Sequence, residues 1–234
     1  MRVGIIQSNY LPWRGYFDFI DDVDVFVVHD DLQFTKGDWR NRNRIKTPQG
    51  VRWLTVPVHY RHSAQLIGET EIDYSRNWPR DHRNLIAACL GKAPFVRDVL
   101  DLLDPEFDAG HRTISELNVA LLASTCRYLR IATPLRLSSE FHLTGAKTER
   151  LIELLTKLGA TTYVSGPSAR AYLEERRFDE AGIALEYKEY AYQPYPQLWG
   201  PYETAVSIVD TIANCGPAAR RGLKSARRTK QVAA

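Results

Sequence analysis

Residues 29–46, which read HDDLQFTKGDWRNRNRIK, hold side chains suited to proton transfer and anion binding. His29, Asp30 and Asp31 directly follow or end an apolar run, where a strand would end. A carboxylate can accept a proton from an amine, bind Mg²⁺ or orient an arginine, and an imidazole titrates near neutral pH. We therefore predict that these three residues are the catalytic groups.

Three arginines alternate with asparagines later in the same stretch. If the backbone is extended there, the arginines share one face and the asparagines the other; in a helix, Arg40 and Arg44 would still be neighbours. Arginine binds phosphate and carboxylate groups through paired hydrogen bonds. Aromatic residues interleave with the charges, which favours partial burial over the alternative, a solvated charged loop. The predicted substrate contacts here are Gln33, Lys36, Trp39, Arg40, Asn41, Arg42 and Arg44.

The loop after the first apolar run, within GIIQSNYLPWRGY, is a second candidate for substrate binding. Gln7 would leave the sheet edge with two hydrogen-bond donors and one acceptor. A helix that begins after Gly15 would turn its N-terminal amides toward the same space, where they could bind an anion. The alternative is a packed aromatic turn. The predicted contacts here are Gln7, Tyr10, Trp13, Arg14 and Tyr16.

Two later loops complete the set of candidates. In SGPSARAYL, Gly166 and Ser168 would let a phosphate or a ligand approach the backbone closely, although Ser168 could equally cap the following helix. In EYAYQPYPQLWG, two prolines hold an extended segment from which Tyr195 and Gln197 could line a sugar or base pocket. The alternative for this segment is a connection that covers the core.

The order of apolar runs and amphipathic stretches predicts an α/β fold. Expected strands lie at 2–7, 23–30, 51–58, 134–141, 161–166 and 183–190, with a charged loop at 30–46. Expected helices lie at 16–23, 78–104 (broken at Gly91 and Pro94), 111–130, 148–159 and 207–216. We predict a three-layer, mostly parallel, Rossmann-like sheet with C-terminal helices. Ligands bind beyond the carboxyl ends of such strands, so the candidate loops should converge at one edge.

Positive charge is concentrated at the end of the chain. The formal net charge is +3, and without the basic residues after 219 the chain would be slightly acidic. We predict one α/β domain over residues 1–220 and a basic, disordered tail over 221–234. The charge balance therefore gives little support to nucleic-acid binding by the body of the protein. The basic residues of this end are Arg220, Arg221, Lys224, Arg227, Arg228 and Lys230.

The sequence lacks the motifs of several functional classes. The three cysteines have no CxxC spacing and the six histidines no HxxxH or HExxH spacing, so we predict no metal site and no disulfide framework. No run is long enough to cross a membrane, and no GxxxxGK[ST], GxGxxG or GxSxG motif occurs. We expect a cytoplasmic protein without a membrane span.

Four segments together resemble the WbqC-like protein family. They are GIIQSNYLPWRGYFDFI, DVFVVHDDLQFTKGDWRNRNRIKTPQGVRWLTVPV, TTYVSGPSARAYL and YPQLWGPYETAVSIVDTIANCG. Ser8 stands where the family pattern has a proline. The resemblance implies a setting in surface-polysaccharide, O-antigen or secondary-metabolite biosynthesis. Some family members are labelled glycine transferases, which implies an activated glycine and the amine of an amino sugar.

A more distant resemblance concerns the nucleotidyl-transferase fold of the pantothenate synthetase type. It implies a carboxylate activated with ATP and Mg²⁺ and then passed to an amine. Those enzymes use an HxGH motif, and the matching positions here are Trp13 and Tyr16, around Arg14 and Gly15. Arg14 or the arginines at 40–44 would have to replace the missing imidazolium groups.

Three functions follow as hypotheses. The first is a transferase that moves an aminoacyl or acyl group onto the amine of a nucleotide-linked amino sugar. The second is a non-catalytic protein that binds a nucleotide sugar or another phosphate ligand through the same arginines. The third, nucleic-acid binding, would depend on the tail alone.

Overall fold

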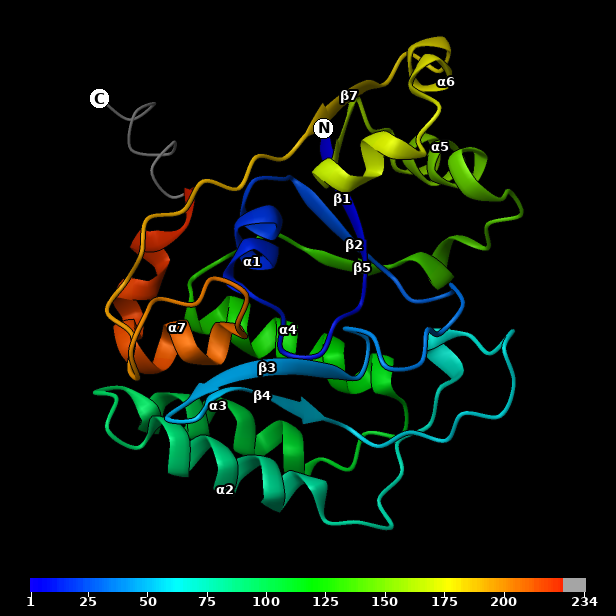
Figure 1. Cartoon of the computed structure of the whole chain (residues 1–234). Helices are drawn as coiled ribbons and strands as arrows, with labels where there is room; N and C mark the ends of the chain where they lie inside the picture. Colours follow the sequence, from blue (N-terminus) through cyan, green and yellow to red (C-terminus); the bar gives the residue numbers. More distant parts are fainter. Residues whose placement is uncertain (225–234) are drawn as a thin grey trace.

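A five-stranded parallel sheet forms the centre of the computed structural model, which describes residues 1–224 (Figure 1). The strand order is β5-β2-β1-β6-β7, and every neighbouring pair is parallel. The predicted parallel sheet is confirmed. Its strands are β1 (Arg2–Gln7), β2 (Val25–His29), β5 (Leu135–Leu137), β6 (Thr162–Ser165) and β7 (Ala184–Tyr187).

Helices cover both faces of this sheet, which confirms the three-layer, Rossmann-like arrangement. The helices α1 (Arg14–Asp21) and α4 (Ile114–Tyr128) share one hydrophobic cluster with Phe26 of β2. The helices α5 (Lys147–Leu158) and α6 (Glu175–Glu180) share the other with Val27. Neighbouring residues of β2 thus enter opposite clusters, because side chains alternate along a strand.

Gly4 in β1 lets α1 approach the sheet closely. A Cβ atom at this position would lie 2.6 Å from the Phe19 ring of α1. Phe19 itself is fully buried and packs edge-on against Phe26 at 5.8 Å. A larger residue at Gly4 would therefore push α1 away from the edge of the sheet where the candidate loops begin.

The remaining helices lie mostly below the sheet in Figure 1. The predicted helix 78–104 is broken near Gly91 and Pro94, as expected, into α2 and α3. A C-terminal helix, α7, confirms the prediction at 207–216. The bounds are α2 (Trp78–Leu90), α3 (Val96–Asp108) and α7 (Ile208–Cys215), with short 3-10 helices η1 (Ile67–Glu69), η2 (Ser138–Phe141), η3 (Pro167–Ala171) and η4 (Gly216–Gly222).

One sequence-based prediction of the fold is wrong. The loop expected at 30–46 ends in a strand, β3 (Arg42–Thr47), which pairs antiparallel with β4 (Gly50–Thr55) in a separate two-stranded sheet. Asn43 and Ile45 are buried on one side of β3, with the half-buried Arg44 between them. The sequence shows this alternation, but its polar residues favour a loop. The strand expected at 51–58 is therefore half of a hairpin outside the parallel sheet.

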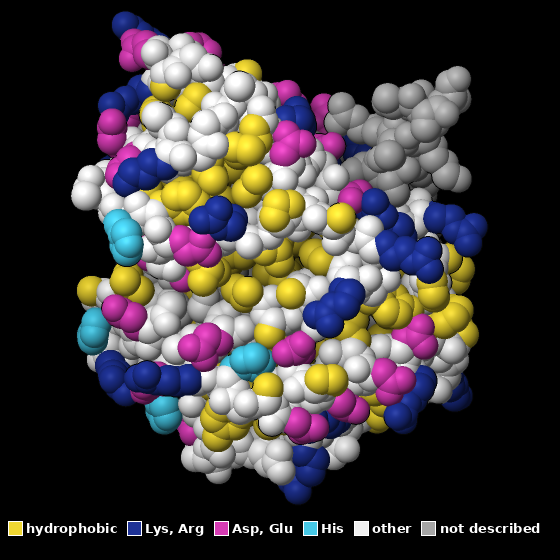
Figure 2. All heavy atoms as spheres, turned by 180° about the vertical axis from the view of Figure 1, so that it is seen from behind, with side chains coloured by type: hydrophobic (Ala, Val, Ile, Leu, Met, Phe, Trp, Pro, Cys, Tyr) yellow, Lys and Arg dark blue, Asp and Glu magenta, His cyan; other side chains and the backbone are white. Residues whose placement is uncertain are grey.

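The C-terminal end is packed as far as the structure describes it. Leu223 is buried, and Arg220 forms an ion pair with Asp21. The rest of the predicted tail, 225–234, lies outside the described residues. Acidic and basic side chains are mixed over the face shown in Figure 2, with hydrophobic side chains gathered across its middle. Within residues 1–224, no helix is both long and apolar enough to cross a membrane.

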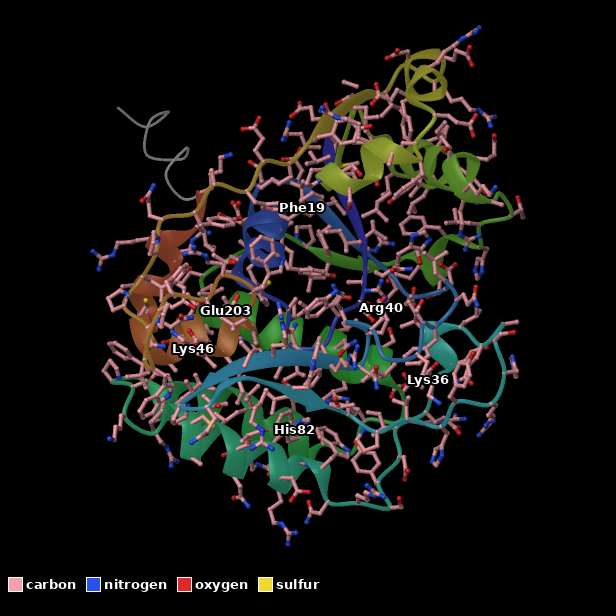
Figure 3. The ribbon with its side chains drawn as sticks, in the orientation of Figure 1. Phe19, Lys36, Arg40, Lys46, His82 and Glu203 are labelled. Carbon is pink, nitrogen blue, oxygen red and sulfur yellow. The ribbon has the colours of Figure 1, made fainter. Side chains whose placement is uncertain are left out.

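His82 lies on α2 beneath the hairpin (Figure 3). Its burial leads us to expect that the fold is less stable at acid pH. Burial lowers its pKa from 6.5 to about 4. Between these values the unfolded chain binds a proton that the folded chain does not, so the free energy of unfolding should fall as the pH decreases from 6.5 to 4. Urea denaturation at pH 7 and pH 4.5 would measure this fall.

His82→Gln supplies the control for this prediction, because Gln keeps a hydrogen-bonding group near the Tyr10 hydroxyl, 2.9 Å from His82 Nδ1. The variant should lose less stability than the wild type over the same pH interval. An equal loss in both proteins would show that other groups cause the acid sensitivity.

Candidate functional site

A cleft of about 820 Å³ lies at the carboxyl ends of β1, β2 and β6. Its floor contains Gln7, His29 and Ser165, the last residues of these three strands. The chain passes from β1 to β2 on one side and reaches β6 on the other, so the cleft lies where the strand order reverses. Such a reversal leaves a crevice that binds ligands in open parallel sheets. Each of the four candidate loops contributes at least one residue to its lining, as does the start of α5.

His29 is the predicted catalytic residue that borders this cleft. Its Nε2 lies 3.4 Å from Arg150 Nε, which donates to it, and 3.5 Å from Asp31 Oδ1. Burial lowers the pKa of His29 to about 4; the Asp31 carboxylate opposes this shift and the Arg150 guanidinium adds to it. The imidazole is therefore neutral near pH 7, with its lone pair on Nε2.

Asp31 and Arg150 form an ion pair beside this imidazole. Asp31 also accepts a hydrogen bond from the Ser138 hydroxyl. Arg150 NH1 donates to the carbonyl oxygens of Leu143 and Gly145, at 3.0 and 3.3 Å. Both charged groups are therefore fixed by several partners, and they would stabilise one orientation of His29.

Asp30 has a different environment from Asp31. Its carboxylate accepts hydrogen bonds from the Ser139 hydroxyl at 2.9 Å and the Ser139 amide at 3.1 Å, and it shares the Ser138 hydroxyl proton, at 3.1 Å, with Asp31. Only 6% of Asp30 is exposed, and it does not line the cleft. Asp30 thus links the end of β2 to η2 through hydrogen bonds.

Arg40 lies behind the floor of the cleft rather than in it. Its guanidinium donates to the side-chain oxygens of Gln7 and Asn9. In Figure 3 it lies between the end of β1 and the hairpin. Arg40 binds both amide oxygens and so fixes the side chains of Gln7 and Asn9, two residues that line the cleft. Each of these two amides keeps its NH₂ group as a hydrogen-bond donor.

Lys147 and Arg150 add positive charge to the cleft, and the sequence analysis missed them. Both lie in the first turn of α5 and line the cleft. Lys147 has φ of +50°, a conformation that non-glycine residues rarely adopt and that often marks functional sites. Basic residues are unfavourable at a helix N-terminus. The presence of Lys147 and Arg150 in the first turn of α5 is therefore the sequence pattern that could have identified them as candidate ligand contacts.

Aromatic and small residues form the rest of the cleft. Trp13 lines it from the loop after β1, Tyr16 from α1, and Gly166 and Ser168 from η3 and the residue before it. All four are among the predicted substrate contacts. The Tyr16 hydroxyl donates to the Gln7 carbonyl oxygen at 3.0 Å. The cleft thus combines flat apolar surface with hydrogen-bond donors, as sugar and nucleotide sites do.

Several predicted contacts lie away from the cleft. Tyr10 is fully buried, and Arg14 stacks on Tyr192 and Tyr195 with only 5% of its surface exposed. The Asn41 side chain donates to the Val56 carbonyl oxygen at 2.8 Å and holds the hairpin. The structure brings none of these three to the cleft.

Gln33 and Lys36 are exposed on the loop after β2, where Gln33 donates to the Ser63 carbonyl oxygen at 2.6 Å. Figure 3 shows Lys36 on the opposite side of Arg40 from the hairpin. Tyr195 and Gln197 both donate to Asp210 Oδ1, at 2.7 and 2.8 Å. The last two residues therefore fasten the proline-rich segment to α7 instead of lining the cleft.

Arg42 and Arg44 face outward from the hairpin and stack on tryptophans. The Arg42 guanidinium lies 4.1 Å from the Trp53 ring centroid, and that of Arg44 lies 5.6 Å from the Trp39 ring centroid. Neither forms an ion pair with a carboxylate within residues 1–224. The predicted row of three arginines is thus divided, since Arg40 turns toward β1.

Replacing Arg150 with Gln should raise the pKa of His29. The guanidinium lowers this pKa, and its loss would also free the Asp31 carboxylate to stabilise the imidazolium. Titration of the His29 ring protons by NMR would measure the change. Arg176→Gln, in an exposed pair with Glu180, is the matched control and should leave the pKa unchanged. A pKa that stays near 4 in Arg150→Gln would contradict this electrostatic coupling.

Comparison with known proteins gives two matches of nearly full length. A model of the WbqC-like protein family matches residues 7–222. The Uncharacterized protein Rv1507c of Mycobacterium tuberculosis (strain ATCC 25618 / H37Rv) is 47% identical over 218 residues, which cover 92% of this chain and 94% of that protein. The family match includes the three strand ends that border the cleft, at Gln7, His29 and Ser165. No solved structure matches the chain significantly.

Proposed function

The chain belongs to the WbqC-like protein family, and from this premise we propose that it transfers an aminoacyl or acyl group, such as glycyl, onto the amine of an amino sugar. The observation that carries the proposal is the floor of the cleft, where a neutral imidazole, oriented amide donors and two cations meet. Acyl transfer to an amine needs each of these: a proton acceptor, donors for a developing oxyanion, and charge for an anionic leaving group.

His29 is the proposed proton acceptor. The amine attacks the acyl carbonyl carbon, a C–N bond forms, and the amine proton passes to His29 Nε2 in place of the weak contact from Arg150. Asp31 Oδ1, 3.5 Å from this nitrogen, then stabilises the imidazolium. Asp31 acts in this scheme through His29, and Asp30 holds the loop.

The amide NH₂ groups of Gln7 and Asn9 are the proposed donors to the carbonyl oxygen as it becomes negative. Arg40 holds both side-chain amides before the substrate arrives, so little reorganisation is needed. The bond from the carbonyl carbon to the leaving oxygen then breaks. Lys147 and Arg150 take the negative charge of a leaving phosphate, and the proton on His29 returns to that group or to water.

The alternative is a protein that binds a nucleotide sugar or another phosphate ligand without chemistry. The low pKa of His29 favours it, because an imidazole with a pKa of about 4 is a weak base. A bound phosphate or ammonium group would change this pKa. Measuring whether acylated product forms therefore distinguishes the transferase from the binding protein. We place either activity in the cytoplasm, because the three free cysteines would stay reduced there. The setting we propose is surface-polysaccharide or secondary-metabolite assembly.

Mass spectrometry of reaction mixtures tests the proposal. The full chain is incubated with nucleotide-linked amino sugars and with glycyl donors, both pre-activated and formed from glycine, ATP and Mg²⁺. We expect the acceptor to gain the mass of one glycyl group, and Asp31→Asn to form product more slowly. Tight binding of the acceptor without any acylated product under all conditions would favour the non-catalytic alternative.

A further inference from the structure

A groove of about 390 Å³ opens beside the cleft and shares Asn9 and Trp13 with it. Its other walls include Trp39, from the loop before β3, and Thr204 and Ala205, from the segment before α7. The volume is within the range of about 300–1,000 Å³ typical of small-molecule sites. A single ligand could therefore pass from the cleft into the groove along their common border.

Two tryptophans border this groove. Trp13 is held by edge-on contacts with Tyr190 and Tyr192, at 5.1 and 5.7 Å between ring centroids. Trp39 is 38% exposed, and its ring lies 5.3 Å from that of Trp53, which is 42% exposed. Large exposed indoles placed side by side are uncommon on a protein surface and offer a flat apolar face to a ring.

Two arginines lie beside the exposed indoles, and the nearby Asp38 carboxylate pairs with Arg40 and not with them. Arg44 lies near both rings, at 5.6 Å from Trp39 and 5.7 Å from Trp53, and Arg42 stacks on Trp53. In each arginine the Nε atom is buried and lacks a hydrogen-bond partner among the described residues. Stacking leaves the edges of a guanidinium available to a phosphate. The groove thus has two tryptophan rings in its walls, and two arginines without a paired carboxylate lie beside it on the hairpin.

We propose that this groove binds the nucleoside diphosphate portion of a nucleotide-linked sugar. The base stacks on the face of Trp39 that lines the groove, the diphosphate lies near the Asn9 amide and the Arg44 guanidinium, and the sugar extends into the cleft. The inference rests on the proposed function, because it assigns a position to the acceptor of that reaction. It accounts for two exposed tryptophans and for two neighbouring arginines that pair with no carboxylate among the described residues.

Calorimetry with the full chain tests this assignment. The probes are UDP, ADP, the matching nucleosides and inorganic pyrophosphate. Trp39→Ala should raise the Kd of the preferred nucleoside diphosphate by about 5- to 100-fold, the usual effect of removing an aromatic ring on which a base stacks. Trp39→Phe should keep most of the affinity. Arg44→Gln should weaken binding of the diphosphate more than binding of the nucleoside.

The controls use residues outside the groove and outside the cleft. Tyr60→Ala removes another exposed ring, and Arg97→Gln removes another exposed arginine, which pairs with Asp101. Both should leave the Kd unchanged. The assignment is overturned if no nucleoside diphosphate binds at millimolar concentration, or if Trp39→Ala binds like the wild type. It is also overturned if pyrophosphate alone binds as tightly, or if a single-stranded oligonucleotide binds far more tightly than any mononucleotide.

The same variants separate this inference from the proposed function. If acylated product forms but Trp39→Ala changes neither binding nor turnover, the groove is not the nucleotide site and the proposed function stands. If binding depends on Trp39 but no acylated product forms, the groove is the nucleotide site and the proposed function fails.

Discussion

Replacing His29 with Gln should lower kcat/KM for acyl transfer by about 10²–10⁴-fold, the usual contribution of a general base. Gln cannot accept the amine proton, yet its amide can still contact Asp31 and Arg150. The Kd of the nucleotide-linked acceptor should therefore stay close to the wild-type value, and the effect should appear in kcat. Steady-state kinetics with the acceptor varied would measure both quantities.

Two controls make the result for His29 interpretable. The circular dichroism spectrum of His29→Gln should match that of the wild type, because the histidine lies at the rim of the sheet. His59→Gln changes an exposed histidine on the loop after β4 and should leave the rate unchanged. A rate within about threefold of the wild type in His29→Gln would remove this residue from the mechanism and leave Asp31 to be tested as the base.

Replacing Lys188 with Met should lower the free energy of unfolding by about 3–5 kcal/mol, the typical cost of breaking a buried ion pair on one side. Lys188 Nζ lies 3.1 Å from both Asp18 Oδ1 and Asp22 Oδ2, and only 6% of the lysine is exposed. Methionine fills similar space but removes the ammonium group that pairs with the fully buried Asp18 carboxylate.

The matched control for Lys188 is an exposed ion pair. Arg177, which pairs with Glu149, has 42% of its side chain exposed, and Arg177→Met should cost about 0–1 kcal/mol. Urea denaturation followed by fluorescence would compare the two variants. Equal and small losses would mean that water screens Lys188 as well as it screens Arg177.

The Lys188 substitution should also affect the ligand groove. Lys188 follows β7 and fixes the segment that carries Tyr190 and Tyr192 against α1. These two rings hold Trp13 at the border of the cleft and the groove. We therefore expect Lys188→Met to weaken nucleotide binding even at temperatures where the chain stays folded.

The sequence was sufficient to predict the parallel sheet because its strands are buried on both faces. Val25, Phe26, Val27 and Val28 form a continuous apolar run, which is typical of such strands. It also placed Gln7 and His29 correctly at strand ends. The common edge followed from the rule that parallel strands end on the same side of a sheet.

The hairpin could not be predicted in the same way, since its alternation involves polar residues. Asn43 is buried because its side chain donates to the Tyr10 carbonyl oxygen at 3.1 Å, and Asn41 is buried through its bond to Val56. Burial of an asparagine depends on a backbone group elsewhere in the fold. Composition therefore indicated a loop where the structure has a strand.

The cations of the cleft were missed for a related reason. Lys147 and Arg150 begin an amphipathic helix whose apolar face is clear, so nothing in its periodicity separates a ligand contact from a solvated residue. Their role depends on where α5 begins relative to β1 and β2. Conversely, Tyr195 and Gln197 have the right chemistry for a sugar pocket, but the buried Asp210 of α7 accepts their hydrogen bonds.

A crystal structure of the chain with a nucleotide-linked amino sugar would test the central claim most directly. We predict that the sugar amine lies about 3 Å from His29 Nε2, within hydrogen-bond reach, with the base against Trp39. A ligand bound on another surface, or held in the cleft with its amine pointing into bulk water, would contradict the proposed acyl transfer at this site.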